Sequence, residues 1–253
     1  TITGGTIATT GSAKLIATSG TSTLDGVTLA GTLEFDASGN PNVDIENGLV
    51  LDNGLINYTT SRSFSFTQTG QLRFLGAGVQ SLSGTGDITF STGVESGVSY
   101  RLFANDTAGT LDIGSGITIS GEHSGLVGQA TSGLVNHGLI HANSTTGAGI
   151  FVNGTDWSSD GVLKSSNSGN LYLDGTFSGE SLSNQVGYGS FDSTAGGAIN
   201  VWGTVSNATN LQNINLSDTS GNLSIQGGTI TGGTIATTGS AKLIATSGTS
   251  TLD

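Results

Sequence analysis

The chain has 253 residues with 43 glycines, one proline, no cysteine and no methionine, and only 9% of its residues are charged. Its formal net charge is −12 and its six lysines and arginines stand singly, so binding of nucleic acid or of anionic lipid is not expected. Without cysteine, the chain has no disulfide, no catalytic thiol and no thiolate metal site. No apolar run approaches the roughly 18 residues of a membrane span, so membrane insertion is not predicted for this segment.

Short strand-like segments, each opened by a glycine, follow one another along the whole chain. They alternate apolar and polar residues, which is the period of a strand with one buried face, and no helical spacing competes with it. The segments are GTLEF at 31–35, GLINY at 54–58, GQLRF at 70–74, GDITF at 86–90, GTLDI at 109–113, GLIHA at 138–142, GNLYL at 169–173, GAINV at 197–201 and GNLSI at 221–225. Their recurrence at similar intervals indicates a repeating coil of about 20 residues.

The alternation assigns one side of each segment to a buried core. It places Leu33 and Phe35 on the same face of their strand, and Leu171, Leu173 and Ile225 in the corresponding positions farther along. A coil of about 20 residues cannot bury such a face alone, so the coils must stack upon one another. We therefore predict an all-β protein, a right-handed parallel β-helix with about 20 residues per coil. The handedness follows from the general chirality of parallel crossovers.

A loop of alternating oxygen-bearing side chains occupies residues 36–44, with the sequence DASGNPNVD. Asp36, Ser38, Asn40, Asn42 and Asp44 place an oxygen at every second position, and Ca²⁺ accepts six to eight oxygen ligands in loose geometry. We take Asp36, Asn40 and Asp44 as the candidate ligands of a Ca²⁺ site, and we predict no other cofactor. The simpler alternative is a turn between coils, because the loop lacks the glycine position and the terminal glutamate of an EF-hand.

Polysaccharide lyases and glycosidases also use β-helices, so an enzyme is the rival interpretation. Their active sites need carboxylates a few ångströms apart on adjacent coils. The acidic residues that could supply them are Asp36, Asp44 and Glu46 and, separately, Asp156 and Asp160. Carboxylates on a solvated face are much commoner than catalytic pairs, and we do not expect the chain to be an enzyme.

The three histidines give no reason to predict a metal site. His137 and His141 are an i, i+4 pair, but that spacing places two side chains on one face only in a helix, and no helix is predicted. The third, His123, stands alone in the sequence.

The opening of the chain, TITGGTIATTGSAKLIATSGTSTLD at residues 1–25, returns letter for letter as residues 229–253. Chance does not produce such an identity in a chain of this length, and a fixed period is typical of stacked repeat architectures. We divide the chain into one complete repeat unit, residues 1–228, and the start of an identical unit, residues 229–253, with no linker between them. The same identity would arise if one end of a continuous fibre had been joined to the other, and both interpretations imply end-to-end repetition.

Two stretches have the style of a known group of proteins. They are GLVNHGLIHANSTTGAGIFVNGTDWSSDGVLKSSNSGNLYLDGTF at 133–177 and QGGTITGGTI at 226–235. These phrases resemble the giant repetitive surface exoproteins and adhesins of bacteria, similar to the filamentous haemagglutinins. The resemblance implies a secreted protein at the cell surface or outside the cell. Its partners would be copies of itself, end to end, and glycans or other cells, and no catalytic residue is carried over.

Two classes of function remain open from the sequence. The expected one is a structural or adhesive repeat segment of a long secreted bacterial surface fibre. The alternative is a β-helix module that binds or degrades polysaccharide. An adhesive surface predicts a local aromatic or acidic patch on the flank, whereas a mechanical spacer predicts none. The aromatic candidates for such a patch are Tyr58, Trp157, Tyr172, Tyr188 and Trp202.

Overall fold

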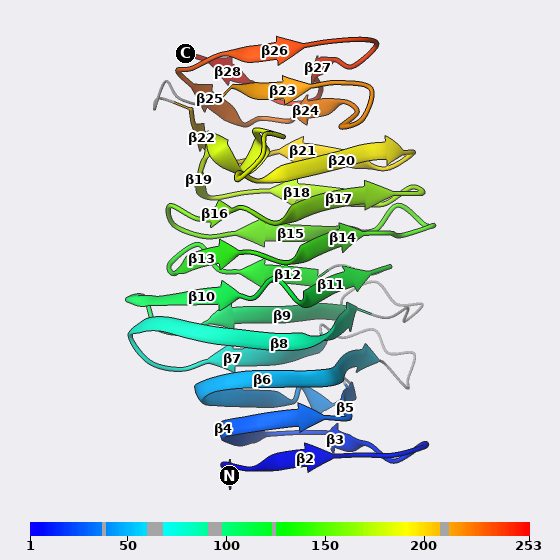
Figure 1. Ribbon diagram of the computed structural model, residues 1–253, viewed down its shortest axis with the longest axis vertical. Coiled ribbons are helices and arrows are strands. Elements are labelled where there is room, and N and C mark those ends of the chain that lie inside the picture. The colour runs from blue at the N-terminus through cyan, green and yellow to red at the C-terminus, as the bar shows by residue number, and fades with distance from the viewer. Residues whose placement is uncertain (37–38, 60–67, 91–97, 123–124, 208–212) are drawn as a thin grey trace.

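The computed structural model describes residues 1–36, 39–59, 68–90, 98–122, 125–207 and 213–253, and for residues 68–69 and 98–99 it describes the backbone only. The chain winds into an elongated rod with its two termini at opposite ends (Figure 1). All pairings between its strands are parallel, and one sheet joins 22 of them. The predicted all-β parallel β-helix is therefore confirmed.

The strands are short, except where one strand bends across more than one face of the rod. In chain order they are β1 (Ile2–Thr3), β2 (Thr6–Ala8), β3 (Leu15–Ala17), β4 (Thr21–Ala30), β5 (Thr32–Asp36), β6 (Asn42–Thr59), β7 (Gln68–Phe74), β8 (Gly78–Phe90), β9 (Val98–Ala104), β10 (Gly109–Ile113), β11 (Ile117–Gly121), β12 (Gly125–Gly128), β13 (Gly133–Asn136), β14 (Leu139–Ala142), β15 (Gly149–Asn153), β16 (Ser158–Ser159), β17 (Val162–Ser166), β18 (Asn170–Leu173), β19 (Thr176–Ser178), β20 (Ser190–Ala195), β21 (Ala198–Val201), β22 (Thr204–Ser206), β23 (Ile214–Leu216), β24 (Leu223–Ile225), β25 (Thr229–Thr231), β26 (Ile235–Thr237), β27 (Leu243–Ala245) and β28 (Thr251–Leu252). A short 3₁₀ helix, η2 (Gly179–Leu182), interrupts the pattern between β19 and β20.

Each coil has three faces. In the middle of the rod, β10, β13 and β16 stack on what we call the first face, β11, β14 and β17 on the second, and β12, β15 and β18 on the third. In Figure 1 the first and second faces are turned toward the viewer with their arrows pointing right, while the third lies behind with its arrows pointing left. Because the chain climbs steadily from the N-terminus to the C-terminus, this winding is right-handed, as predicted.

The core consists of vertical columns of inward side chains. One column on the third face passes through eight successive coils and contains Val43, Leu72, Leu102, Val127, Val152, Leu173, Val201 and Ile225. A second column, on the second face, contains Leu33, Ile56, Ile88, Ile119, Ile140, Leu163 and Phe191. The residues predicted for the core, Leu33, Phe35, Leu171, Leu173 and Ile225, are at most 2% exposed. Each buried aliphatic side chain contributes ~1.5–3 kcal/mol relative to an exposed one.

Coil length varies more than the sequence analysis predicted. Leu223 pairs with Leu243 across a short coil, whereas Leu49 pairs with Leu82 across a much longer one. The extra residues of a longer coil lie at its corners, as those of η2 do between β19 and β20. A corner accommodates inserted residues because the strands on either side of it keep their register with the neighbouring coil. Stacking therefore constrains the strands and not the number of residues between them.

Candidate functional site

Two of the predicted Ca²⁺ ligands, Asp36 and Asp44, lie in the successive strands β5 and β6, and the third, Asn40, lies between these strands, so the Ca²⁺ site stays a prediction. Asp36 ends β5, and Asn40 takes a left-handed backbone with φ of 53°. Asp44 lies in β6 and is almost buried, and its Oδ1 accepts a hydrogen bond from Arg73 Nε at 2.7 Å. Ser38, also part of the proposed loop, lies outside the described residues. Across the described ranges, no group of three or more His, Asp or Glu side chains could hold a metal ion.

The acidic residues weighed for catalysis have different surroundings in the fold. Glu46 is exposed on β6. Asp156 sits at a corner, where its Oδ1 accepts a hydrogen bond from the Thr176 hydroxyl at 2.9 Å. Asp160 interacts with His137, described below, so Asp156 and Asp160 have different partners despite their proximity in the sequence.

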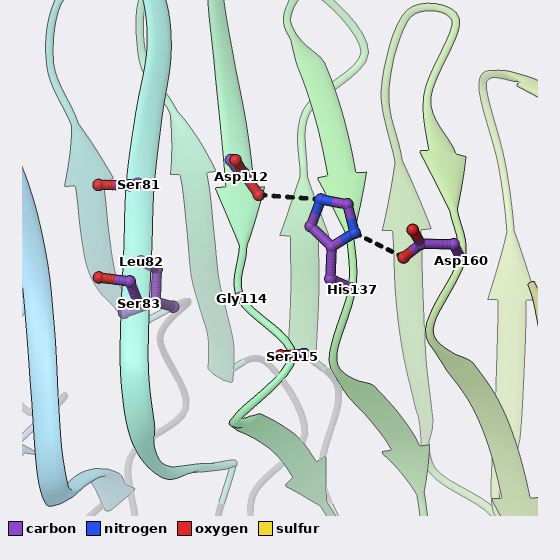
Figure 2. Close-up of a pocket in the computed structure, with 8 residues that line it drawn as sticks. All are labelled: Ser81, Leu82, Ser83, Asp112, Gly114, Ser115, His137 and Asp160. Carbon is purple, nitrogen blue, oxygen red and sulfur yellow. Dashed lines mark hydrogen bonds and ion pairs between the residues drawn. The ribbon is translucent and has the colours of Figure 1, made fainter. Parts of the chain in front are cut away.

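His137 lines a depression on the rod, at the edge of the first face (Figure 2). Asp112 comes from β10, His137 follows β13 directly and Asp160 follows β16, so three successive coils each supply one side chain. The distance from His137 Nε2 to Asp112 Oδ1 is 3.4 Å, and that from His137 Nδ1 to Asp160 Oδ1 is 2.5 Å. The imidazole thus bridges two carboxylates along the rod axis.

The depression has a volume of about 550 Å³. Its lining residues, most of them polar, are Ser81, Leu82, Ser83, Asp112, Gly114, Ser115, His137 and Asp160. A second depression of about 220 Å³ shares His137 and Asp160 and adds Glu180 and Tyr188. Near His137 and Asp160, the inward side chains of the first face are polar. Asn136 and Ser159 are buried there, and Asn136 donates a hydrogen bond to the Ser159 hydroxyl at 2.9 Å.

The arrangement is a row of three side chains in which the imidazole lies between two carboxylates. An imidazolium can donate to Asp112 and Asp160 together, whereas a neutral imidazole can donate to only one of them. Glycoside hydrolysis needs one carboxyl group as the acid and a second facing water or the sugar. Here both carboxylates face the same imidazole, and within the described part of the chain no hydrogen bond joins Ser83 or Ser115 to His137. The depression therefore presents polar and acidic side chains.

The other described histidine, His141, belongs to a different cluster on the second face. Its Nε2 lies 2.8 Å from the hydroxyl of Ser166, which is only 8% exposed. Lys164, in register with His141, pairs with Asp192 at 2.8 Å. Burial lowers the pKa of His141 and the Lys164 charge lowers it further, while Asp192 opposes the shift. His123 lies outside the described residues.

The five aromatic candidates divide between the inside and the outside of the rod. Tyr58 and Trp157 are fully buried, and Tyr188 lines the smaller depression beside His137. Tyr172 and Trp202 face outward on the third face, where they join a ring that the sequence analysis missed, Phe151. Strand alternation alone could have found it, because Phe151 lies between the inward residues Ile150 and Val152.

No described helix is long and apolar enough to cross a membrane. Comparison with protein-family models, with curated proteins and with solved structures gave no match to this chain.

Proposed function

We propose that this chain is a repeat segment of a long, secreted bacterial surface fibre with a structural or adhesive role, in which units continue one another end to end. The observation that carries the proposal is that one sequence, present as residues 1–25 and again as residues 229–253, lies at both ends of the rod. The first copy has a neighbouring coil on its C-terminal side, and the second copy rests on a coil on its N-terminal side.

Each of the two copies folds into a coil with equivalent strand pairing. Ile2 pairs with Leu24 in the first copy, and the equivalent Ile230 pairs with Leu252 in the second. The segment at residues 15–17 pairs with the strand beyond it, β5, and the equivalent segment at residues 243–245 pairs with the strand before it, β24. One sequence therefore accepts a partner on either edge, as the middle coil of a continuous stack must.

Burial in the two copies is complementary. Ile2 is 41% exposed whereas its equivalent Ile230 is 2% exposed, and Leu24 is 3% exposed whereas its equivalent Leu252 is 62% exposed. Superposing the two copies would give each of these side chains an apolar neighbour. An open depression of about 120 Å³ at the N-terminal end, lined in part by Ile2, Leu15 and Ile16, would be covered by the same contact. Exposed strand edges and apolar ends are what a further coil satisfies.

The repeat does not contain a whole number of coils. Nine successive pairings climb the third face from the first copy, through β1, β4, β6, β7, β9, β12, β15, β18, β21 and β24. The second copy then starts one face later. Its first strand, β25, pairs with β22, which pairs with β19, and these three strands continue the first face. One unit thus spans nine and one-third coils, fewer than a uniform coil of about 20 residues would give. At about 4.8 Å per coil it advances the rod by roughly 45 Å and turns it by about a third of a revolution.

Small-angle X-ray scattering of proteins carrying a single, double or triple copy of residues 1–228 tests the stacking. The maximum dimension should grow by roughly 45 Å per added unit at a constant cross-section, since the coils continue through the junction. A matched control inserts a flexible Gly/Ser linker between units and should lose the constant increment. Units that behave as independent beads without the linker would contradict the proposal. Immunogold electron microscopy of the producing cells tests the surface location separately.

A further inference from the structure

We propose that the outward rings of Phe151, Tyr172 and Trp202 form a binding platform for a neutral polysaccharide chain on the third face of the rod. The proposal gives a ligand class to the adhesive part of the proposed function and rests on it. A single unit carries the whole platform, so binding does not require the units to stack. The two proposals can therefore fail separately.

The three rings come from successive coils and touch one another. Phe151 in β15 and Tyr172 in β18 are stacked, with ring centroids 4.6 Å apart and planes 17° apart. Trp202 follows β21, with its centroid 4.6 Å from that of Tyr172 and 5.5 Å from that of Phe151. Because the three centroid distances are similar, the rings form a compact triangular cluster that draws on three successive coils.

Strand alternation and the small residue Gly149 keep the aromatic cluster on the outside of the rod. The residues that flank Tyr172, Leu171 and Leu173, point into the core, so Tyr172 must point outward. Its ring lies across Gly149, where an added Cβ would come within 2.6 Å of Tyr172 Cε2 and 2.7 Å of the Asn170 carbonyl oxygen. Trp202 remains 39% exposed, and its indole N–H donates to Gln226 Oε1 at 2.9 Å. That bond fixes the orientation of the exposed indole.

Hydrogen-bonding side chains lie next to the cluster of Phe151, Tyr172 and Trp202. Asn153 donates to Asp174 Oδ2 at 3.0 Å in the column that continues to Trp202. Asn170 lies two residues before Tyr172 in β18, and its Oδ1 accepts a hydrogen bond at 3.5 Å from Asn200, which is in register with Tyr172 and only 6% exposed. Amide and carboxylate groups can each bond hydroxyl groups, as acceptors or, for the amides, also as donors.

This combination matches a pyranose chain. One face of a sugar ring presents C–H groups, which pack on the negative face of an aromatic ring, while its edge presents hydroxyl groups to flanking amides. The rings lie on the outside of the rod and draw on three successive coils, so an extended chain running along the rod can contact them.

Area and charge argue against other occupants. A stable protein interface buries roughly 800 Å² on each partner, far more than one partly exposed indole and two half-buried rings provide. A second copy of the chain would also carry the same net charge of −12, which disfavours association of two copies. The carboxylate of Asp174 disfavours anionic polysaccharides in the same way.

Along the proposed fibre, the third of a turn per unit would carry successive platforms around the rod. Every third unit would then present its platform on the same side. Weak sites repeated on one fibre gain avidity through effective concentration, so a modest affinity at each platform is enough for adhesion.

Affinity electrophoresis of the 253-residue chain in native gels containing hydroxyethylcellulose, xylan or galactomannan tests the platform. We expect retardation by at least one of these neutral polysaccharides, and none by alginate. Trp202→Ala should weaken retardation about ten-fold, and Trp202→Phe should weaken it less, because a smaller ring still stacks. Tyr188→Ala, which removes an aromatic ring from the other depression, is the matched control and should leave retardation within about two-fold of the wild type.

Three results would overturn the platform. They are no retardation by any neutral polysaccharide, equal retardation of the wild type and Trp202→Ala, and a change in sedimentation coefficient on Trp202→Ala that reveals self-association through this face. Circular dichroism of each variant shows that it has folded. As a second readout, the neutral polysaccharide that retards the wild type should reduce acrylamide quenching of tryptophan fluorescence, since Trp202 is exposed and Trp157 is buried.

Discussion

Two of the aromatic stacks in the described part of the rod begin with ring pairs of almost the same geometry, but the two stacks have opposite surroundings. The inner stack, defined by Phe35, Tyr58, Phe90 and Tyr100, begins with ring centroids 4.4 Å apart and planes 14° apart, and its rings are at most 1% exposed. The outer stack, defined by Phe151, Tyr172 and Trp202, begins with centroids 4.6 Å apart and planes 17° apart, and ends in an exposed indole. A ring becomes core or surface according to whether its position in the strand is odd or even.

The two stacks therefore contribute differently to folding. Rings of the inner stack gain the full transfer free energy of burial as well as the stacking contact. Rings of the outer stack gain the contact, but leave part of their surface in water. The inner stack should accordingly determine stability, while the outer stack should be free to serve recognition.

The largest expected difference in stability is between a charge placed on the inner side of β18 and a charge placed on its outer side. Leu171→Asp puts a carboxylate without a partner into the core and should cost several kcal/mol, enough to prevent folding of the surrounding coils. The adjacent Tyr172→Asp points outward and should cost only ~1 kcal/mol. Circular dichroism and urea unfolding would compare the two variants. Equal damage from both would show that the assignment of inside and outside in β18 is wrong.

A smaller difference should follow from truncating one ring in each stack. Phe35→Ala removes a fully buried ring and should cost ~3–5 kcal/mol, because a cavity remains among rigid neighbours. Phe151→Ala should cost ~1 kcal/mol, since water can fill the vacated surface. The urea midpoints of the two variants would give the ranking, and a reversed order would contradict the proposed division of roles.

The inner stack itself offers a finer test, based on its two hydroxyl groups. Tyr58 donates to the Arg101 carbonyl oxygen at 3.1 Å, whereas the buried Tyr100 hydroxyl has no hydrogen-bond partner among the described residues. Tyr58→Phe should therefore cost ~1 kcal/mol, and Tyr100→Phe should be neutral or stabilising. Burial raises the pKa of both hydroxyls, so neither contributes charge near neutral pH. Destabilisation by Tyr100→Phe of the same size would reveal a partner for that hydroxyl.

The smallest expected effect is a pH dependence from the outward side of the second face. The pKa of His141 is lowered by burial and by Lys164, so the unfolded state binds its proton more readily than the folded state does. This contribution to stability is fully present above the unfolded pKa of about 6.5, and it is lost as the pH falls through that value toward the folded pKa. Urea midpoints at pH 8 and pH 5 should differ less for His141→Gln than for the wild type. An unchanged difference would exclude His141 as the cause.

Much of the architecture could be predicted from the sequence because a β-helix is built from local patterns. All nine glycine-led segments lie in or next to strands, and Leu33, Phe35, Leu171, Leu173 and Ile225 are buried as their alternation indicated. The variation in coil length could not be predicted, because corners accept insertions that leave the stacking register intact.

The candidate sites could not be predicted either, because each joins residues from different coils. Asp112, His137 and Asp160 are separated in sequence by whole coils, and so are Phe151, Tyr172 and Trp202. Their proximity depends on the length of every intervening corner, and one extra residue in a strand would reverse the side on which each ring lies. Alternation along one strand is a local property, and the sequence by itself determined the inside, the outside and the repeat. Which outward residues become neighbours is a property of the stack, so only the tertiary structure decided the depression at His137 and the cluster of Phe151, Tyr172 and Trp202.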